Sequence, residues 1–328
     1  MGIANIKVSV CIPVYGVEKY IEKCVRTLFG QTLQEIEYIF VDDCTPDRSI
    51  EILQAVLEEY PHRKEQVKII HHEKNGGLVA ARNTALKHVS GEYVIHCDSD
   101  DWVELDMYEK MYEKAKESDA DMVYCSYVFE YPDGKKFYKT TRFCNEARQF
   151  LNLMYSSAIP GYLVNKLYKK EIALHESVDC PDDIIMCEDH LRNTFMLPLC
   201  KKIIGMEDRF YHYRKNPNSC CNTNNREWIL KKFDGIRKIV SLAEKSNAVD
   251  YSSILAYKCF ALEMLLIAGN CPDVYAESYS ECKKNIFAIN IPFKLKVVLA
   301  VANISYRLAH WLRRFLTNAK EFYLKIFG

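Results

Sequence analysis

Apolar runs and amphipathic segments alternate over the first hundred residues of the chain. We expect strands over 7–12, 36–41, 67–70 and 92–97, with helices over 18–29, 48–60 and 78–89 between them. The strand candidates are almost wholly apolar, which is typical of parallel strands buried on both faces. This order predicts an α/β fold with a mostly parallel, Rossmann-like sheet and flanking helices. Pro13 is expected to end the first strand.

The pattern continues for a further stretch and then becomes helical. The spacing predicts a helix over 106–118 and a strand over 120–129, followed by a turn at 131–134. From 225 to 290 the apolar residues recur at helical spacing, and we expect this region to pack against the sheet domain or another subunit.

Composition excludes several classes of protein. Hydrophobic residues make up 49% and charged residues 27% of the 328, an ordinary globular balance that excludes a disordered chain. The formal net charge is zero, so the chain-wide basic field of nucleic-acid binders is absent. None of the 14 cysteines forms a C-x-x-C pair, which argues against a zinc or disulfide framework and favours a reducing compartment.

No segment has the features of a targeting or membrane-spanning sequence. The first residues lack a basic region followed by a long apolar run. No stretch reaches the roughly 18 to 20 uncharged apolar residues of a span. We therefore expect a cytoplasmic protein.

Three carboxylates follow the fourth predicted strand. Asp98, Asp100 and Asp101 lie within four residues, and close carboxylates repel one another unless a cation offsets their charge. Oxygen ligands of this kind suit Mg²⁺ or Mn²⁺. The alternative is a helix cap, with Asp101 at the start of the helix expected near Leu105.

A second polar group is expected at the same edge of the sheet. Asp43 ends the second strand, where its carboxylate could accept a hydrogen bond from a nucleotide base. Gly76 permits close approach of backbone to a ligand, and Arg82, in the next helix, could reach a phosphate. The chain has neither a G-x-G-x-x-G motif after the first strand nor a P-loop, so the usual dinucleotide and P-loop sites are excluded.

These residues belong to five ordered motifs that carry a resemblance. They are Val10-Cys-Ile-Pro-Val-Tyr15, Val41-Asp-Asp43 with Asp47 and Ser49, Asn75-Gly-Gly-Leu78 with Ala80-Ala-Arg-Asn83, Gly91-Glu-Tyr93 and Asp98-Ser-Asp-Asp-Trp102. In order and spacing the chain resembles the family 2 glycosyltransferases of the GT-A fold over roughly residues 7–215. Two positions depart from the family pattern: Gly16 stands where the family usually has Asn, and Cys44 where it usually has Gly.

The resemblance implies an inverting glycosyltransferase that uses a nucleotide-diphosphate sugar, expected to be UDP-linked, with Mn²⁺ or Mg²⁺. It implies that the nucleotide sugar is bound by Pro13, Val14, Tyr15, Asp43, Gly76, Arg82, Asp98 and Ser99. Asp98 and Asp100 would form the metal-binding pair, with Asp100 as the direct ligand. A metal that bridges diphosphate oxygens neutralises the charge of the leaving group.

The general base and the acceptor side are expected in the second half. In the resemblance Asp189 is the base, at the opening of a helix, and Asn165, Lys166 and Glu188 lie on the acceptor side. The alternative for the Glu188-Asp189 pair is an N-cap. The segment Tyr211–Arg214 with Asn216–Ser219 resembles the family's acceptor loop; we expect His212 to be packed or solvated and leave it out of the site.

The domain boundaries follow from this interpretation. We expect a catalytic domain over 1–220, with a nucleotide-sugar half over about 1–105 and an acceptor half over about 106–220, then a helical region over 221–290. Residues 291–328 hold seven basic side chains against one acidic, a net charge of +6, interleaved with Trp, Phe and Leu. This predicts a basic amphipathic C-terminal helix that binds an anionic inner-membrane surface or packs in the protein or an oligomer.

The resulting hypothesis is a transferase that extends a glycan or lipid-linked glycan in cell-surface polysaccharide synthesis, peripheral on the cytoplasmic face of the membrane. Two alternatives remain. A nucleotidyltransferase would usually carry a Gly-rich basic loop after the first strand, which Pro13–Gly16 lacks. A non-catalytic sugar-nucleotide binding module would be favoured if Asp189 pointed away from the cleft.

Overall fold

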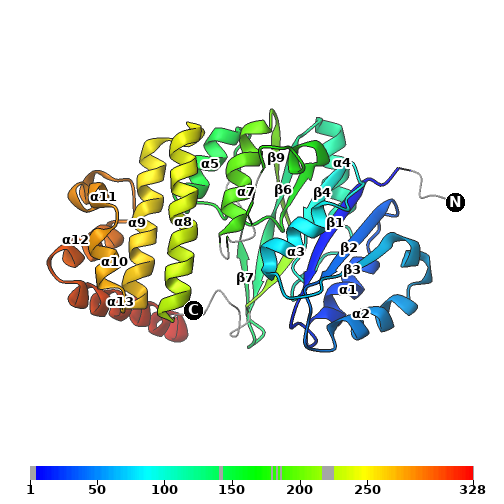
Figure 1. Ribbon diagram of the computed structural model, residues 1–328, viewed down its shortest axis with the longest axis horizontal. Coiled ribbons are helices and arrows are strands. Elements are labelled where there is room, and N and C mark those ends of the chain that lie inside the picture. The colour runs from blue at the N-terminus through cyan, green and yellow to red at the C-terminus, as the bar shows by residue number, and fades with distance from the viewer. Residues whose placement is uncertain are drawn as a thin grey trace. The chain divides into compact units, whose positions relative to one another are not determined.

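The computed structural model describes residues 5–139, 143–178, 180–181, 184, 187–215 and 225–327, with side chains as far as residue 316 (Figure 1). The chain divides into two compact units. The first comprises residues 1–150 with 159–217, and the second comprises 151–158 with 218–328.

The first unit is built on one mixed sheet with the strand order β3-β2-β1-β4-β8-β6-β9-β5, and β7 pairs with β6. The strands are β1 (Val8–Val14), β2 (Ile36–Asp42), β3 (Val67–His71), β4 (Tyr93–His96), β5 (Trp102–Val103), β6 (Met122–Glu130), β7 (Lys136–Lys139), β8 (Lys166–Lys169) and β9 (Ile203–Arg214). Strands β1 to β4 pair in parallel, as the alternating pattern predicts. Strand β8 is antiparallel to both β4 and β6, so the complete sheet is mixed.

The first strand continues through Pro13, contrary to our expectation. The pairing of β1 with β4 stops at Cys11, whereas its pairing with β2 continues to Val14. The carbonyl of Pro13 accepts a hydrogen bond from Ser99, on the side where β4 has already ended. Because no β4 partner stands opposite, the missing N–H of Pro13 removes no ladder bond.

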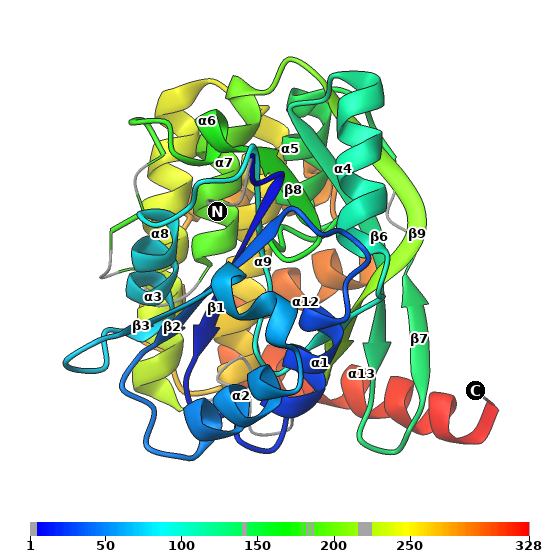
Figure 2. The same ribbon diagram turned by 90° about the vertical axis from the view of Figure 1, so that its right-hand side faces the viewer.

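The helices of this unit cover both faces of the sheet. They are α1 (Ile21–Phe29), α2 (Ser49–Glu58), α3 (Gly77–Leu86), α4 (Met107–Ser118), α6 (Lys170–Ala173) and α7 (Glu188–Met196), with 3₁₀ turns at Pro61–Gln66 and Leu197–Leu199. Val10 and Phe40 share one apolar core with α1, α2 and α4. Successive strand residues point to opposite faces, so Cys11 and Ile39 face the side where α3 packs (Figures 1 and 2).

The second unit is helical, as the periodicity predicts. Helix α5 (Ala147–Tyr155) contributes its C-terminal part, and the other helices are α8 (Arg226–Ser246), α9 (Tyr251–Ala268), α10 (Pro272–Glu277), α11 (Ser280–Lys284), α12 (Phe293–Ile304) and α13 (Tyr306–Phe327), with a 3₁₀ turn at Ile286–Ala288. Within the described residues, α9 alone has the length and apolarity to cross a membrane, and half of it is buried. A buried core helix has the same properties, so this is weak support for a span.

The C-terminal tail forms two helices, not the single one expected. Ser305 separates α12 from α13 in an extended conformation, with φ −150° and ψ 110°. The chain therefore changes direction at Ser305, and the two helices pack on each other and on α9. Tyr306 and His310 bind the carbonyls of Leu265 and Leu266 at the end of α9.

Candidate functional site

The C-terminal ends of β1, β2 and β4 meet at one edge of the sheet, where ligands of such folds bind. Tyr15 follows β1 and is 52% exposed, so its ring is available for stacking. The side chain of Val14 lies in the apolar core, and its carbonyl accepts from the N–H of Asp43, so Val14 shapes the strand end without presenting a side chain.

Asp43 is buried and holds the loop between β3 and α3. Its Oδ1 accepts from the N–H of Gly76 (2.8 Å) and contacts Nδ1 of His72 (2.8 Å), while its Oδ2 accepts from the N–H of Gly77 (2.7 Å). A Cβ at Gly76 would lie 2.9 Å from the Cβ of Ala80, and Gly77 has φ +85°. Both glycines are therefore required for this contact. Sequence reasoning missed His72, because nothing near it in the chain indicates its partner.

The two departures from the family pattern have a common conformation. Gly16 has φ +67° and Cys44 has φ +58°, both in the left-handed region. The N–H of Gly16 donates to Thr45 Oγ1 (2.8 Å), which joins the ends of β1 and β2. Cys44 is exposed and adopts this conformation with a Cβ, at a position where Gly would have no steric cost.

The acidic loop after β4 is fixed from the distant strand β9. The hydroxyl of Tyr211 accepts from the N–H of Asp98 (3.2 Å) and donates to Oδ2 of Asp101 (2.7 Å), whose Oδ1 accepts from the N–H of Arg214 (2.7 Å). Asp101 therefore caps no helix: α4 begins at Met107, after Asp106. The capping alternative for Asp101 is wrong, because its buried carboxylate turns toward β9.

Negative charge is concentrated in this loop. Burial, and then the charges of Asp100 and Asp98, raise the pKa of Asp101 well above its usual range. Within the described ranges no three His, Cys, Asp or Glu side chains are arranged to hold a metal ion. Asp98 and Asp100 are partly exposed, and carboxylate oxygens are ligands that suit Mg²⁺ or Mn²⁺. Their binding of one ion stays a prediction.

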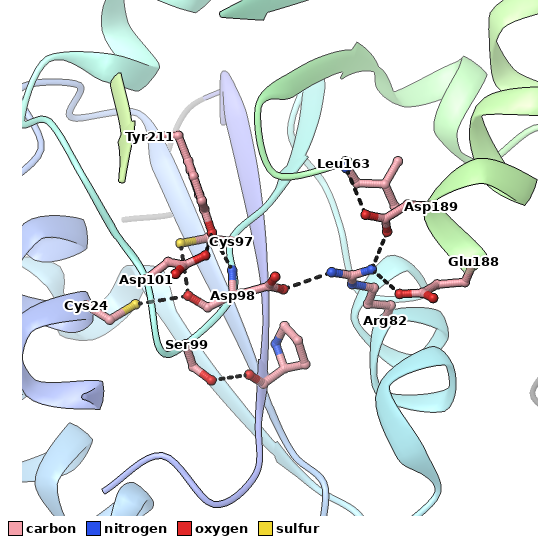
Figure 3. A network of polar contacts seen from close by, with 11 residues as sticks. Cys24, Arg82, Cys97, Asp98, Ser99, Asp101, Leu163, Glu188, Asp189 and Tyr211 are labelled. Atoms are coloured by element: carbon pink, nitrogen blue, oxygen red, sulfur yellow. Dashed lines mark hydrogen bonds and ion pairs between the residues drawn. The ribbon is translucent and has the colours of Figure 1, made fainter. Parts of the chain in front are cut away.

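One guanidinium joins this loop to helix α7 (Figure 3). Arg82, on α3 and 2% exposed, donates through Nη2 to Asp98 Oδ1 (2.8 Å) and through Nη1 to Glu188 Oε1 (2.6 Å) and Asp189 Oδ1 (2.5 Å). Three carboxylates thus share one positive charge. The sequence assigned Arg82 to the diphosphate, and that contact stays a prediction.

The excess negative charge affects Glu188. Burial, followed by the charge of Asp189, raises the pKa of the Glu188 carboxyl to about 7. The charge of Arg82 opposes this shift. Glu188 is therefore partly protonated near neutral pH.

Asp189 lies in the first turn of α7, as expected, and does not cap it. Cys187 occupies the cap position, with φ 68° and no side-chain cap bond. The Oδ2 atom of Asp189 accepts from the N–H of Leu163 (3.3 Å), while Oδ1 accepts from Arg82. Its side chain points toward Arg82 and Asp98, so the N-cap alternative is wrong.

Lys166 and Asn165 are buried and support the segment that precedes β8. Lys166 donates to the carbonyls of Pro160 and Tyr162, and Asn165 donates to the carbonyl of Cys125 (2.6 Å). Burial lowers the pKa of Lys166 to about 7, and the charge of Asp189 opposes the shift. Both residues stabilise the loop that contacts Asp189; a direct contact with the acceptor stays a prediction.

His212 is packed, in agreement with its exclusion from the site. Its ring stacks on Trp102, with centroids 3.4 Å apart, and Nε2 contacts Oε1 of Glu104 at 2.8 Å. The rest of the expected acceptor loop, Asn216–Ser219, lies outside the described residues. Sequence reasoning gave no role to Tyr211, although the Tyr211–Arg214 motif was a signal that this segment matters.

The chain is similar in sequence to known glycosyltransferases. The family model described as "Glycosyl transferase family 2" matches residues 9–186. The uncharacterized glycosyltransferase EpsJ of Bacillus subtilis is 33% identical over 218 residues, which is 65% of this chain and 62% of EpsJ. The poly(ribitol-phosphate) beta-glucosyltransferase of Bacillus spizizenii is 30% identical over 210 residues, 63% of this chain and 32% of that protein. The chain thus spans less than two thirds of either relative.

Solved structures share the fold at low identity. TarS residues 1–349 from S. aureus, in complex with UDP-GlcNAc, aligns with a TM-score of 0.63 at 19% identity. The alignment covers 95% of this chain and 92% of that one. At this identity the likeness establishes the common fold, a GT-A-like α/β sheet followed by helices.

Proposed function

This chain belongs to glycosyl transferase family 2, and we propose that it transfers a sugar, with inversion, from a nucleoside-diphosphate sugar to a hydroxyl of a glycan acceptor. The expected donor is a UDP-sugar. The UDP-GlcNAc held by TarS, a protein of the same fold, supports this choice.

The contact of one guanidinium with both Asp98 and Asp189 carries the proposal. Arg82, itself buried, binds a carboxylate of the expected metal pair and the expected base, both of which keep some exposed area. Inverting transfer needs these two acids on opposite sides of the reacting sugar carbon. Their attachment to the same side chain supports a single reaction site between β4 and α7.

Asp98 and Asp100 would hold a divalent metal ion at this edge of the sheet. When bound, the ion neutralises charge on the diphosphate leaving group. Tyr15 would stack on the base and Asp43 would accept from its N–H, while the amides of Gly76 and Gly77 keep Asp43 in place.

Asp189 would accept the proton of the acceptor hydroxyl. The oxygen of that hydroxyl forms a bond with the anomeric carbon, the bond from that carbon to the diphosphate breaks, and the nucleoside diphosphate leaves with the electron pair. Arg82 and the N–H of Leu163 hold the two oxygens of Asp189, so the carboxylate has a fixed orientation before the acceptor binds.

A non-catalytic binding module is less well supported, because Asp189 points toward Asp98 and not away from it. A nucleotidyltransferase would usually need a Gly-rich basic loop after β1. The chain has Pro13-Val-Tyr-Gly16 there, without a basic residue.

We further propose that the second unit binds the cytoplasmic face of an anionic membrane, where the protein would extend cell-surface or lipid-linked glycans. Three exposed apolar side chains of α13, Leu308, Trp311 and Phe315, follow one another at intervals of three and four residues. Arg307 and Arg314, also exposed, lie beside them. Apolar and basic side chains on one exposed face suit an anionic interface.

The test is turnover of sugar nucleotides with Mn²⁺ by the full chain and by Asp189→Asn. Asn keeps the size of the side chain but cannot take up the proton. We expect normal UDP binding and turnover reduced by at least about a hundredfold, the low end for loss of a general base. Turnover within a few-fold of wild type would rule out Asp189 as the base, and absence of UDP binding in the wild type would rule out the donor class.

A further inference from the structure

An open cavity of about 880 Å³ runs along helix α3 in the first unit. One wall is formed by the end of β3, the loop after it and α3, and the other by residues 173–180 together with Arg192 of α7. Cavities that bind small molecules have about 300–1,000 Å³. The acids Asp98, Asp100 and Asp189 do not line this space, which we call the α3 cavity.

The α3 cavity contains a buried guanidinium without an acidic partner. Arg192 lines the cavity and is 2% exposed. Its Nη2 donates to Oδ1 of Asn83, which belongs to a neutral amide, and its Nε has no hydrogen-bond partner. In the part of the chain that the structure describes, Arg192 forms no ion pair; the nearby acids Glu188 and Asp189 are bound to Arg82 instead.

A buried charge without a partner is unfavourable. Burial lowers the pKa of Arg192, and the carboxylates of Glu188 and Asp189 oppose this shift only from a distance. A guanidinium that has lost its water is stabilised when an anion binds its N–H groups. Its planar set of donors matches the oxygens of a phosphate particularly well. The surroundings of Arg192 therefore suit an anionic ligand.

The described walls of the cavity carry an excess of positive charge. Lys74 and Lys87 line it, are exposed and form no ion pair within the described ranges. Glu73 is the one acid among the described lining residues, and three histidines also line the cavity. Counted with Arg192, the walls hold three cations against one carboxylate, although the whole chain has zero net charge. A local excess of this kind attracts anions.

Lys87 is placed to share a ligand with Arg192. Asn83, which binds Arg192, precedes Lys87 by four residues, and its carbonyl accepts from the N–H of Lys87 (3.3 Å). Side chains four residues apart on a helix lie on the same face. Gly76, which lines the other end of the cavity, is about 16 Å away along the helix. The cavity therefore has room for more than a single anion.

We propose that the α3 cavity binds a phosphate group, either free phosphate or the phosphate of a small metabolite, with Arg192 as the buried donor and Lys87 beside it. The site does not depend on the proposed function, because none of the residues assigned to the metal or to the base lines it.

The test is ³¹P NMR titration of the full chain in chelator, with inorganic phosphate and with glycerol 3-phosphate. We expect both to bind, and we expect glycerol, followed by proton NMR, not to bind. Tighter binding of glycerol 3-phosphate assigns the site to a metabolite, and equal affinity assigns it to free phosphate. Arg192→Met should weaken binding about tenfold, as expected for a charged contact in a buried position. Lys87→Ala should weaken it about threefold, since Lys87 is exposed.

Two controls separate the α3 cavity from other anion sites. Lys201→Ala removes an exposed lysine that does not line the cavity and should change nothing. Because His72 lines the cavity and also contacts Asp43, the titration is repeated with saturating UDP and Mg²⁺, which should leave phosphate bound.

Thermal unfolding shows whether Arg192→Met is folded, and Lys87→Ala carries the test if it is not. Absence of phosphate binding in the wild type, equal affinity in Lys87→Ala and Lys201→Ala, or displacement of phosphate by UDP would each overturn the site. Failure of UDP to bind would instead contradict the proposed function and leave the phosphate titration unaffected.

Discussion

Arg82 donates a 2.5 Å hydrogen bond to Asp189, a residue 107 positions later in the chain. The same guanidinium binds Asp98 and Glu188, so the buried cluster has more carboxylates than positive charges. Metal binding at Asp98 and Asp100 and protonation of Glu188 would both relieve this imbalance.

Loss of Arg82 should destabilise the protein. Arg82→Met leaves three carboxylates without their common partner, and we expect the free energy of unfolding to fall by about 3–5 kcal/mol at pH 7.5. Arg26→Met removes an exposed ion pair with Glu22 and Glu59 and should cost less than about 1 kcal/mol. Urea unfolding of both variants measures the difference. Equal small losses would show that the buried cluster does not depend on Arg82.

Donor binding should require a divalent cation through Asp100, supported by Asp98. We expect calorimetric titration of UDP to show at least about tenfold weaker binding in chelator than in Mn²⁺, because one charged contact is worth about 1.5–3 kcal/mol. Asp100→Asn should remove this dependence. Asp106→Asn, an exposed acid before α4 that pairs with Lys110, should keep it. Equal UDP affinity in chelator and in Mn²⁺ would contradict the metal assignment.

Glu188 should make the protein less stable as the pH rises toward neutrality. Its pKa is about 7 in the folded protein and about 4.5 in the unfolded chain, so between these values only the folded state keeps the proton. Below pH 4.5 both states are protonated and the effect vanishes. From pH 4.5 to 7 the folded state should lose about 3 kcal/mol in all.

Glu188→Gln keeps an acceptor for Arg82 and has no proton to lose. Its free energy of unfolding, measured in urea at pH 5 and pH 7.5, should therefore rise relative to wild type at the higher pH. Glu58→Gln, at the exposed end of α2, serves as the control. Parallel pH profiles of wild type and Glu188→Gln would show that Glu188 is ionised throughout.

Cys44→Gly should stabilise the loop after β2. The left-handed backbone at Cys44 costs a residue with a Cβ about 1–2 kcal/mol, and part of this gain is offset by the greater flexibility of Gly when unfolded. We expect a net gain of up to about 1 kcal/mol in urea unfolding. Cys44→Ala keeps the Cβ and should give no gain. A loss of stability in Cys44→Gly would show that the thiol contributes a contact.

The exposed face of α13 should bind acidic vesicles at low salt. Trp311→Ser with Phe315→Ser removes two exposed rings, so sedimentation with vesicles should fall while stability is unchanged. The matched control is Tyr251→Ser. Tyr251 is 60% exposed and lies at the N-terminal end of α9, whereas α13 contacts the C-terminal end of that helix. High salt should release the wild type, since each basic residue contributes about 1 kcal/mol that salt screens. Unchanged sedimentation of the double variant would show that the two rings do not contribute to vesicle binding.

The sequence predicted the parallel half of the sheet well, because each of its buried strands is a continuous apolar run. Residues 92–97, for example, became β4 at Tyr93–His96. It did not predict that β8 inserts antiparallel between β4 and β6, since pairing over such a separation has no local signal. Pro13 shows a similar limit: its place in β1 depends on where a different strand ends.

In the candidate site, too, some residues could be predicted from the sequence and the contacts between them could not. The acids Asp98 and Asp189 were recognised from their motifs, and the structure brings them to one guanidinium. The contact of Arg82 with both was not predictable, because a side chain that suits a phosphate suits a carboxylate equally well. The role of Tyr211 depends on a hydroxyl whose partner is 110 positions earlier.

The Tyr211 contact makes the acidic loop dependent on a strand from a much later part of the chain. Residues 1–105 supply the acidic loop, yet its conformation depends on a hydroxyl and an N–H contributed by β9. A chimera that joins residues 1–105 of this chain to the second half of a relative inherits a working loop only if the incoming strand brings a tyrosine at the position of Tyr211. Recombination between the two halves of such chains is therefore constrained by one buried hydroxyl far from the point of crossover.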